Sequence, residues 1–165
     1  MAEAQANLYR AIVNKLRVDT GVGSLVVLTG HSSSSASQYR IARDKKPTKS
    51  ETPFLGVSIY QSVPLSDDGP SHIQRARVYF YCYSTEELVA IQLADRVEHL
   101  LHARDEQADL PLGEGTNLGH YNFSDDRIRN QQTRYKSRDL PDFDDDTDVW
   151  QVLVEADLIW NDSPC

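Results

Sequence analysis

The clearest secondary-structure signals lie in IQRARVYFYCYS at residues 73–84 and in TEELVAIQLADRVEHLLH, which follows directly at residues 85–102. In the first part, small or apolar residues alternate with charged and aromatic ones, and this period of two predicts a β-strand. The apolar set is Ala76, Val78, Phe80 and Cys82, and the other set is Arg75, Arg77, Tyr79, Tyr81 and Tyr83. We expect the first face to meet the core and the second to meet water or another subunit.

The period changes to that of a helix after this strand. Ser84 precedes Glu87 by three residues, which is the pattern of a capping box, and the acidic side chains there suit a helix N-terminus. A helix is therefore predicted from residue 84 to about residue 104. Its apolar stripe consists of Ala90, Leu93, Ala94, Val97, Leu100 and Leu101.

The rest of the chain supplies further elements around this strand and helix. Leu8, Ile12 and Leu16 recur every four residues and predict an amphipathic helix over 3–18. We predict strands at Leu25–Thr29, 53–62, 72–83 and 150–160, and a short strand near Leu118–Phe123. The polar segments 30–52 and 105–146 are interpreted as long exposed loops. This order predicts an α+β fold, in which a mainly antiparallel sheet has two helices packed on one face.

Composition limits the class of protein. The chain has 165 residues, with 17 basic and 25 acidic side chains and a formal charge of −8, which fits a single domain over 1–165. No apolar run is long enough to span a bilayer, and the first residues do not have the features of a secretory signal. Cys82 and Cys165 do not make a disulfide scaffold. The acidic balance argues against a protein that coats nucleic acid.

Two blocks of opposite charge follow each other late in the sequence. The basic block is Arg127, Arg129, Arg134, Lys136 and Arg138, and the acidic block is Asp139, Asp142, Asp144, Asp145, Asp146 and Asp148. A second basic segment is Arg40, Arg43, Lys45, Lys46 and Lys49. Solvated loops and phosphate contacts are two interpretations. We favour pairing between adjacent subunits, because a heterologous ring contact can set one block against the other.

The aspartates also suggest a calcium loop. Asp144, Asp146 and Asp148 occupy positions 1, 3 and 5, and Glu155 occupies position 12. Val149 stands at position 6, where such a loop needs glycine, so a solvated acidic turn before a strand is favoured. His99 and His102 are three residues apart and form a second metal hypothesis, with no obvious third ligand.

Sequence patterns for catalysis are missing. The chain has no G-x-S-x-G nucleophile elbow, no Walker A motif and no G-x-G-x-x-G after a strand. We therefore expect no enzyme activity and no cofactor.

The chain resembles the tail terminator and tail-completion proteins of long-tailed bacteriophages. The resemblance rests on TPFLGVSIY, then IQRARVYFYCYS with its aromatic-rich end, the capped helix of TEELVAIQLADRVEHLLH and the final strand of DTDVWQVLVEADLIW after SRDLPDFDDD. It covers essentially the whole chain, and it rests on the order of the predicted elements and on the residue patterns within them. The Ser-rich and Lys-rich segment 30–52 departs from the pattern.

This resemblance implies a structural virion protein without catalytic residues. It implies a ring, usually of six subunits, at the head-proximal end of the tail tube, which ends tube growth and contacts head-closure or neck proteins while DNA passes through the lumen. It also implies a place in the virion after assembly in the host cytoplasm, and no membrane partner. Another neck adaptor, such as a head-closure or minor tail protein, is the alternative. Candidate interface residues are Arg75, Arg77, Tyr79, Tyr81, Arg127, Arg129, Arg134, Asp142, Asp144 and Asp145.

Overall fold

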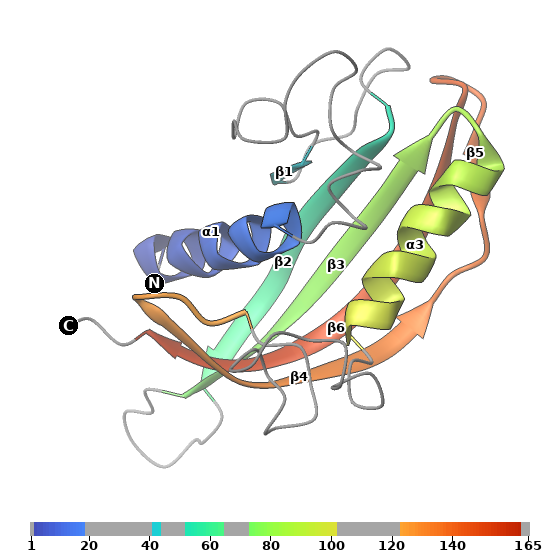
Figure 1. The fold of residues 1–165 in the computed structure, drawn as a ribbon. Helices are drawn as coiled ribbons and strands as arrows, with labels where there is room; N and C mark the ends of the chain where they lie inside the picture. Colours follow the sequence, from blue (N-terminus) through green and yellow to red (C-terminus); the bar gives the residue numbers. More distant parts are fainter. Residues whose placement is uncertain (1, 19–40, 44–51, 65–72, 102–122, 163–165) are drawn as a thin grey trace.

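A computed structural model describes residues 2–18, 41–43, 52–64, 73–101 and 123–162 (Figure 1). In this part of the chain, two helices lie on one face of a six-stranded sheet. The helices are α1 (Ala2–Val18) and α3 (Glu87–Leu101), and the strands are β1 (Ile41–Arg43), β2 (Phe54–Pro64), β3 (Gln74–Ser84), β4 (Ile128–Arg138), β5 (Asp142–Asp144) and β6 (Val149–Asp162). The predicted α+β fold is confirmed.

The strand order is β1-β2-β3-β6-β4, and β5 also pairs with β6. β1 runs parallel to β2, whereas every other pair is antiparallel. The central strand β3 pairs with β6 along its whole length, from Gln74 opposite Trp160 to Ser84 opposite Trp150. β4 pairs with the later part of β6 and β5 with its first three residues, so β4 and β5 follow each other along one edge of β6.

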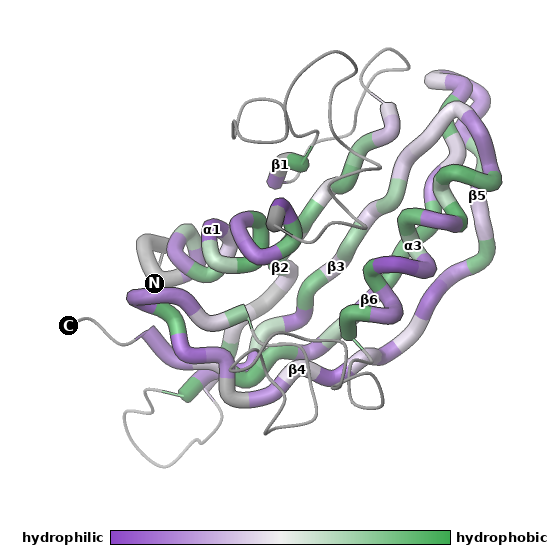
Figure 2. Tube along the Cα trace, in the orientation of Figure 1, coloured by the Kyte–Doolittle hydropathy of each residue, from purple (hydrophilic) through white to green (hydrophobic). Residues whose placement is uncertain are grey.

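The hydrophobic core lies between the sheet and the two helices, and Figure 2 shows apolar and polar residues alternating along the strands. The predicted apolar positions of β3 are fully buried, as are Val152, Val154, Ala156 and Leu158 of β6. Leu8, Ile12 and Leu16 of α1 and the whole predicted stripe of α3 join the same cluster. Burial of both helices against one sheet face is the main driving force for this arrangement.

The start of α3 lies later than the predicted capping box. The helix begins at Glu87, its first backbone bond runs from the N–H of Ala90 to the carbonyl of Glu86, and Ser84 is the last residue of β3. The Oγ atom of Ser84 accepts a hydrogen bond from the backbone N–H of Glu86 at 3.1 Å. The described part of the helix ends at Leu101, and the predicted end near residue 104 lies outside the described residues, as does the strand predicted at Leu25–Thr29. Phe123 is described outside any strand, and residues 118–122 of that predicted strand are not described. Neither described helix has the length and apolar character needed to cross a membrane.

The prediction of a loop over 105–146 is wrong for two segments, which form β4 and β5. β4 is polar because it borders the sheet, and register shifts between Asn130 and Gln132 and between Tyr135 and Ser137 break its alternation. These irregularities hide the period of two on which the prediction of strands relies. The loop predicted over 30–52 is likewise wrong at Ile41–Arg43, which forms the short strand β1.

Candidate functional site: the open face of the sheet

The candidate site is the sheet face opposite the helices, which we call the open face. Side chains alternate along a strand, so the residues between the core positions of β3 and β6 point to this face. The register places Arg77 opposite Asp157 and Tyr79 opposite Glu155. Within the described ranges, neither helix packs on this face. The predicted basic and aromatic face of β3 is therefore on the outside of the sheet.

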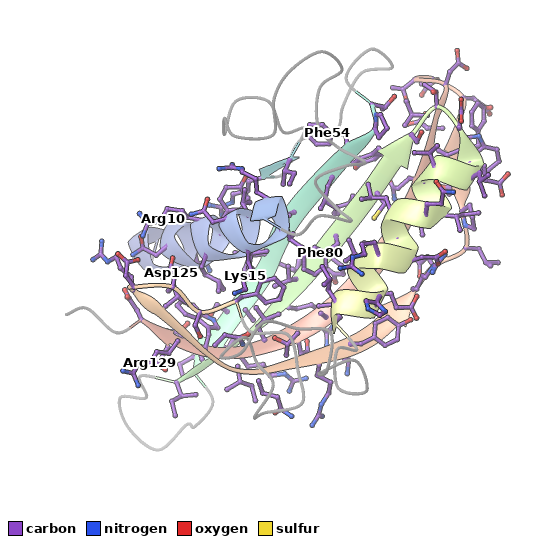
Figure 3. All side chains as sticks on the ribbon, in the orientation of Figure 1. Arg10, Lys15, Phe54, Phe80, Asp125 and Arg129 are labelled. Atoms are coloured by element: carbon purple, nitrogen blue, oxygen red, sulfur yellow. The ribbon has the colours of Figure 1, made fainter. Side chains whose placement is uncertain are left out.

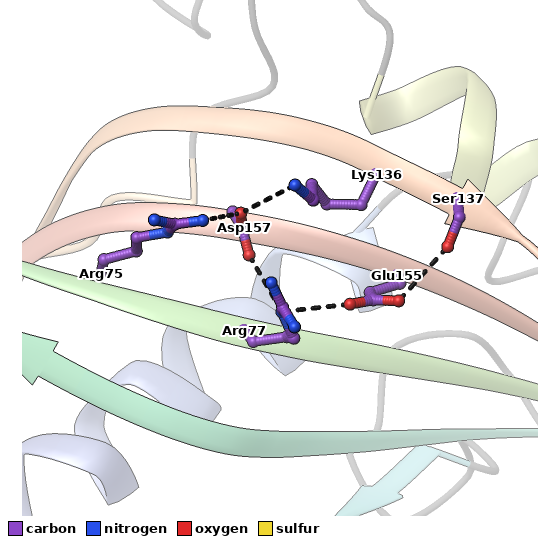
Figure 4. A network of polar contacts seen from close by, with 6 residues as sticks. All are labelled: Arg75, Arg77, Lys136, Ser137, Glu155 and Asp157. Carbon is purple, nitrogen blue, oxygen red and sulfur yellow. Dashed lines mark hydrogen bonds and ion pairs between the residues drawn. The ribbon is translucent and has the colours of Figure 1, made fainter.

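Asp157 is the centre of a charge network on the open face (Figure 4). Its side chain is only 8% exposed, and its Oδ2 atom lies 2.9 Å from Nη2 of Arg75 and 3.7 Å from Nζ of Lys136. Its Oδ1 atom lies 3.5 Å from Nε of Arg77. The three cations come from two strands, β3 and β4, which flank β6 on either side. The network therefore ties the three strands together through one carboxylate.

Glu155 extends the network along β6. Its Oε1 atom lies 3.1 Å from Nε of Arg77, and its Oε2 atom accepts a hydrogen bond from the hydroxyl of Ser137 at 3.3 Å. Arg77 thus bridges the two carboxylates, and the nearby negative charges raise its pKa, with Asp157 as the largest cause. Arg75 and Arg77, predicted as interface residues, already have partners within the chain. If these arginines also contact a neighbouring molecule, they do so while they remain paired with the carboxylates of Asp157 and Glu155.

The protonation of Asp157 should make stability depend on pH. Burial would raise the pKa of this carboxyl, but the hydrogen bond and charge of Arg75, with Arg77 and Lys136, outweigh it and lower the pKa. A carboxyl with a lowered folded-state pKa stabilises the fold above its unfolded-state pKa of about 3.9, and this contribution is lost as the pH falls through the folded-state pKa. We therefore expect the stability advantage of the parent over Asp157→Asn to be constant near neutral pH and to shrink below about pH 4. Urea unfolding at several pH values measures it, and an advantage that does not shrink in acid contradicts this role.

A row of tyrosines occupies the other half of the open face. Ring centroids are 6.0 Å apart for Tyr60 and Tyr79, 6.2 Å for Tyr79 and Tyr81, and 6.1 Å for Tyr81 and Tyr83. Tyr60 is 69% exposed, whereas Tyr83 is buried with Phe54, and burial raises the pKa of Tyr83 to about 12. The row therefore runs from the solvent-exposed ring of Tyr60 to the buried ring of Tyr83, and its accessible part suits contact with a protein surface.

The charged half of the open face is hollowed. Two adjoining depressions share Arg75 and Asp157 in their walls. We call them together the basic hollow, and its lining residues are Val63, Arg75, Arg77, Gln132, Arg134, Asp157 and Ile159. Three arginines against one aspartate leave this hollow with a net positive charge. It is shaped and charged to receive an acidic group.

The structure brings together only part of the predicted interface set. Arg75, Arg77, Tyr79, Tyr81 and Arg134 share the open face. Arg127 and Arg129 lie at the beginning of β4, where Figure 3 shows Arg129 near the end of the sheet that lies away from β5. The predicted acidic residues Asp142, Asp144 and Asp145 belong to β5 and the turn that follows it, at the other end of β6.

Arg138 lies on the helix side of the sheet and is held within the chain. Its Nη1 atom contacts the carboxylate of Asp95 and lies 2.9 Å from Oε2 of Glu98, both in α3. Burial would lower the pKa of Arg138, but hydrogen bonds to these two carboxylates raise it. One member of the predicted basic block therefore joins β4 to α3 and is not presented to a neighbour.

The structure does not place Glu155, the ligand at position 12 of the calcium hypothesis, beside the aspartates. Asp144 and the following aspartates form a hairpin turn, in which Oδ1 of Asp144 accepts a hydrogen bond from the N–H of Asp146 at 3.0 Å. Glu155 lies farther along β6 and is paired with Arg77. Among the described residues, no three His, Cys, Asp or Glu side chains are grouped to hold a metal ion. His102, half of the other metal hypothesis, lies outside those residues.

Sequence reasoning missed the role of Asp157 and considered Glu155 only as a calcium ligand. The signal was present in the alternation, because Arg75 and Arg77 are two residues apart on β3, and Glu155 and Asp157 are two residues apart on β6. Only the register shows that these two pairs face each other. Cys82 lies in the core, as its place on the apolar face of the strand predicted, and burial raises the pKa of its thiol.

The geometry defines an α+β protein whose sheet is covered by helices on one face and presents a charged and aromatic surface on the other. No protein-family model matches the chain, and no curated protein matches it. Fifteen chains of solved structures do match. One belongs to a structure described as the virion of a native gene transfer agent (GTA) particle, with a TM-score of 0.54 and 14% identity over 97% of this chain and 96% of that chain. At that identity, the likeness is one of fold.

Proposed function

We propose that this chain is a non-enzymatic structural protein of a phage-like virion. It forms a ring, with six subunits, at the head-proximal end of the tail tube. The ring ends tube polymerisation and joins the tail to neck proteins, and DNA passes through its lumen. The protein is then found in the virion, with itself, the tube protein and the head-closure proteins as partners.

The observation that carries this proposal is the likeness to a chain of the gene transfer agent virion. The two chains align over nearly their full lengths, so the shared fold is the whole domain and not one common motif. The resemblance of the sequence to tail terminators points to the same class of particle. Fold likeness supports a role only as analogy, so the surface has to agree with it.

The open face agrees with a role in assembly. It combines the exposed ring of Tyr60 and the half-buried rings of Tyr79 and Tyr81 with arginines, and both residue types are enriched at protein interfaces. The chain also has a formal charge of −8, which opposes tight binding of DNA phosphates and suits a lumen through which DNA slides. These features favour contacts with proteins over contacts with nucleic acid.

Negative-stain imaging of the purified protein, alone and mixed with assembled tail tubes of its own particle, tests the proposal. We expect six-fold rings, or a cap on one end only of each tube. Tubes assembled in the presence of the protein should also stop growing once capped. Rings that do not bind tubes would favour a neck adaptor over a terminator, and monomers that do not bind tubes would overturn the proposal.

A further inference from the structure

The hairpin between β5 and β6 carries an unusually dense negative charge. We call Asp142, Asp144, Asp145, Asp146 and Asp148 the acidic tip, and no basic residue lies between positions 139 and 149. Most of these side chains are exposed. Two apolar side chains stand beside them in solvent, because Leu140 is 87% exposed and Phe143 is 39% exposed. The tip is therefore a protruding surface of mixed acidic and apolar character.

The basic hollow has the complementary character. Arg134 is exposed in its wall, and the described part of the chain contains no carboxylate in an ion pair with it. Arg75 and Arg77 retain half and two-fifths of their side-chain exposure, although both contact Asp157. Val63, in the same wall, is 38% exposed, and Tyr60 lies farther along the same strand. The hollow thus offers unsatisfied positive charge beside exposed apolar surface.

The acidic tip cannot reach the basic hollow of its own chain. Asp157 follows Val149 by eight residues along the continuous strand β6. At about 3.3 Å per residue, the hollow lies about 26 Å from the hairpin. Because one strand fixes this spacing, the two surfaces can meet only between different molecules.

We propose that the acidic tip of one copy of this chain docks in the basic hollow of a second copy. Each copy has one tip and one hollow in different places, so copies can repeat this contact head to tail, and the chain of contacts closes into a ring when its rotation permits. The inference rests on the proposed ring and names the surfaces that build it. Charge complementarity sets the register of the contact, and the exposed apolar side chains on both surfaces supply the area to be buried.

A charge-exchange experiment tests this contact. Arg134→Glu and Asp145→Lys each set like charges against each other at the interface, so each is expected to raise the Kd of self-association about tenfold or more. The double variant, Arg134→Glu with Asp145→Lys, restores opposite charges in every interface of the ring and is expected to recover most of the affinity. Sedimentation velocity over a concentration series measures the Kd, and thermal melting verifies that all variants fold.

The matched control is a charge reversal on α1, outside both proposed contact surfaces. Arg10→Glu makes the same charge change on the exposed side of α1, away from both surfaces, and should leave the Kd unchanged. Single variants that assemble like the parent, or a double variant as weak as the single ones, would overturn the docking contact while leaving the ring intact. A parent that stays monomeric both alone and with tubes would overturn the docking contact together with the proposed ring.

Discussion

Trp160→Ala should reduce the free energy of unfolding by about 3–5 kcal/mol, because it removes a large side chain from a closed core. Trp160 is 1% exposed and belongs to the main hydrophobic cluster near the end of β6. Its Nε1–H also donates a hydrogen bond to Oγ of Ser62 at 3.2 Å, and that hydroxyl in turn donates to Oε1 of Gln74 at 2.6 Å. The substitution leaves a cavity and removes the donor to a buried hydroxyl. Urea unfolding followed by circular dichroism gives the value.

Trp160→Phe is the matched control for this prediction. It keeps most of the apolar volume and removes the indole N–H. It should therefore reduce the free energy of unfolding clearly less than the alanine variant does. The difference between the two variants then separates packing from the hydrogen bond to Ser62. A loss below about 1 kcal/mol for Trp160→Ala would mean that the end of β6 is not part of the cooperative core.

Asn130→Ala should reduce the free energy of unfolding by about 3 kcal/mol or more, because this buried side chain makes four hydrogen bonds at the start of β4, two of them to buried groups. Its Oδ1 atom accepts hydrogen bonds from the N–H of Phe123 at 3.0 Å and the hydroxyl of Thr133 at 2.8 Å. Its Nδ2 atom donates to the carbonyls of Gln132 at 3.0 Å and Ile159 at 3.2 Å. Asn130 is 3% exposed, so water cannot easily take over these bonds.

Thr133→Val provides the graded comparison. It removes one hydroxyl from the same network and keeps the other three hydrogen bonds of Asn130. We therefore expect the free energy of unfolding to fall by about 1 kcal/mol. Chemical denaturation of both variants, with amide hydrogen exchange in β4, measures the two effects. Equal losses for the two variants would show that the amide of Asn130 does not organise this end of β4.

The elements predicted from sequence were those whose signal is local. α1 and α3 carry apolar residues at helical spacing, and β3 and β6 alternate over most of their length. The buried face of each segment could therefore be predicted from its own residues. These segments also implied the layer of two helices on one sheet face, because their apolar sides have to be buried against each other.

β4 could not be predicted in the same way. Its inward positions include Asn130 and Thr133, which are polar. Their burial is tolerated because they hydrogen-bond to each other and Asn130 also donates to the carbonyl of Ile159 on β6. Two register shifts against β6 further remove its regular alternation. A strand that depends on a partner's backbone and on buried polar contacts has no signature in its own residues.

Local patterns in the chain were enough to predict the helices, the central strands and two blocks of opposite charge. Where those charges act depends on the fold. It pairs Arg75 and Arg77 with Asp157 and Glu155 across β3 and β6, turns Arg138 toward α3, and sets the acidic tip at the far end of β6 from the basic hollow. Periodicity depends on nearest neighbours in the chain, whereas charge pairing depends on distance in space, which only the register of the sheet fixes.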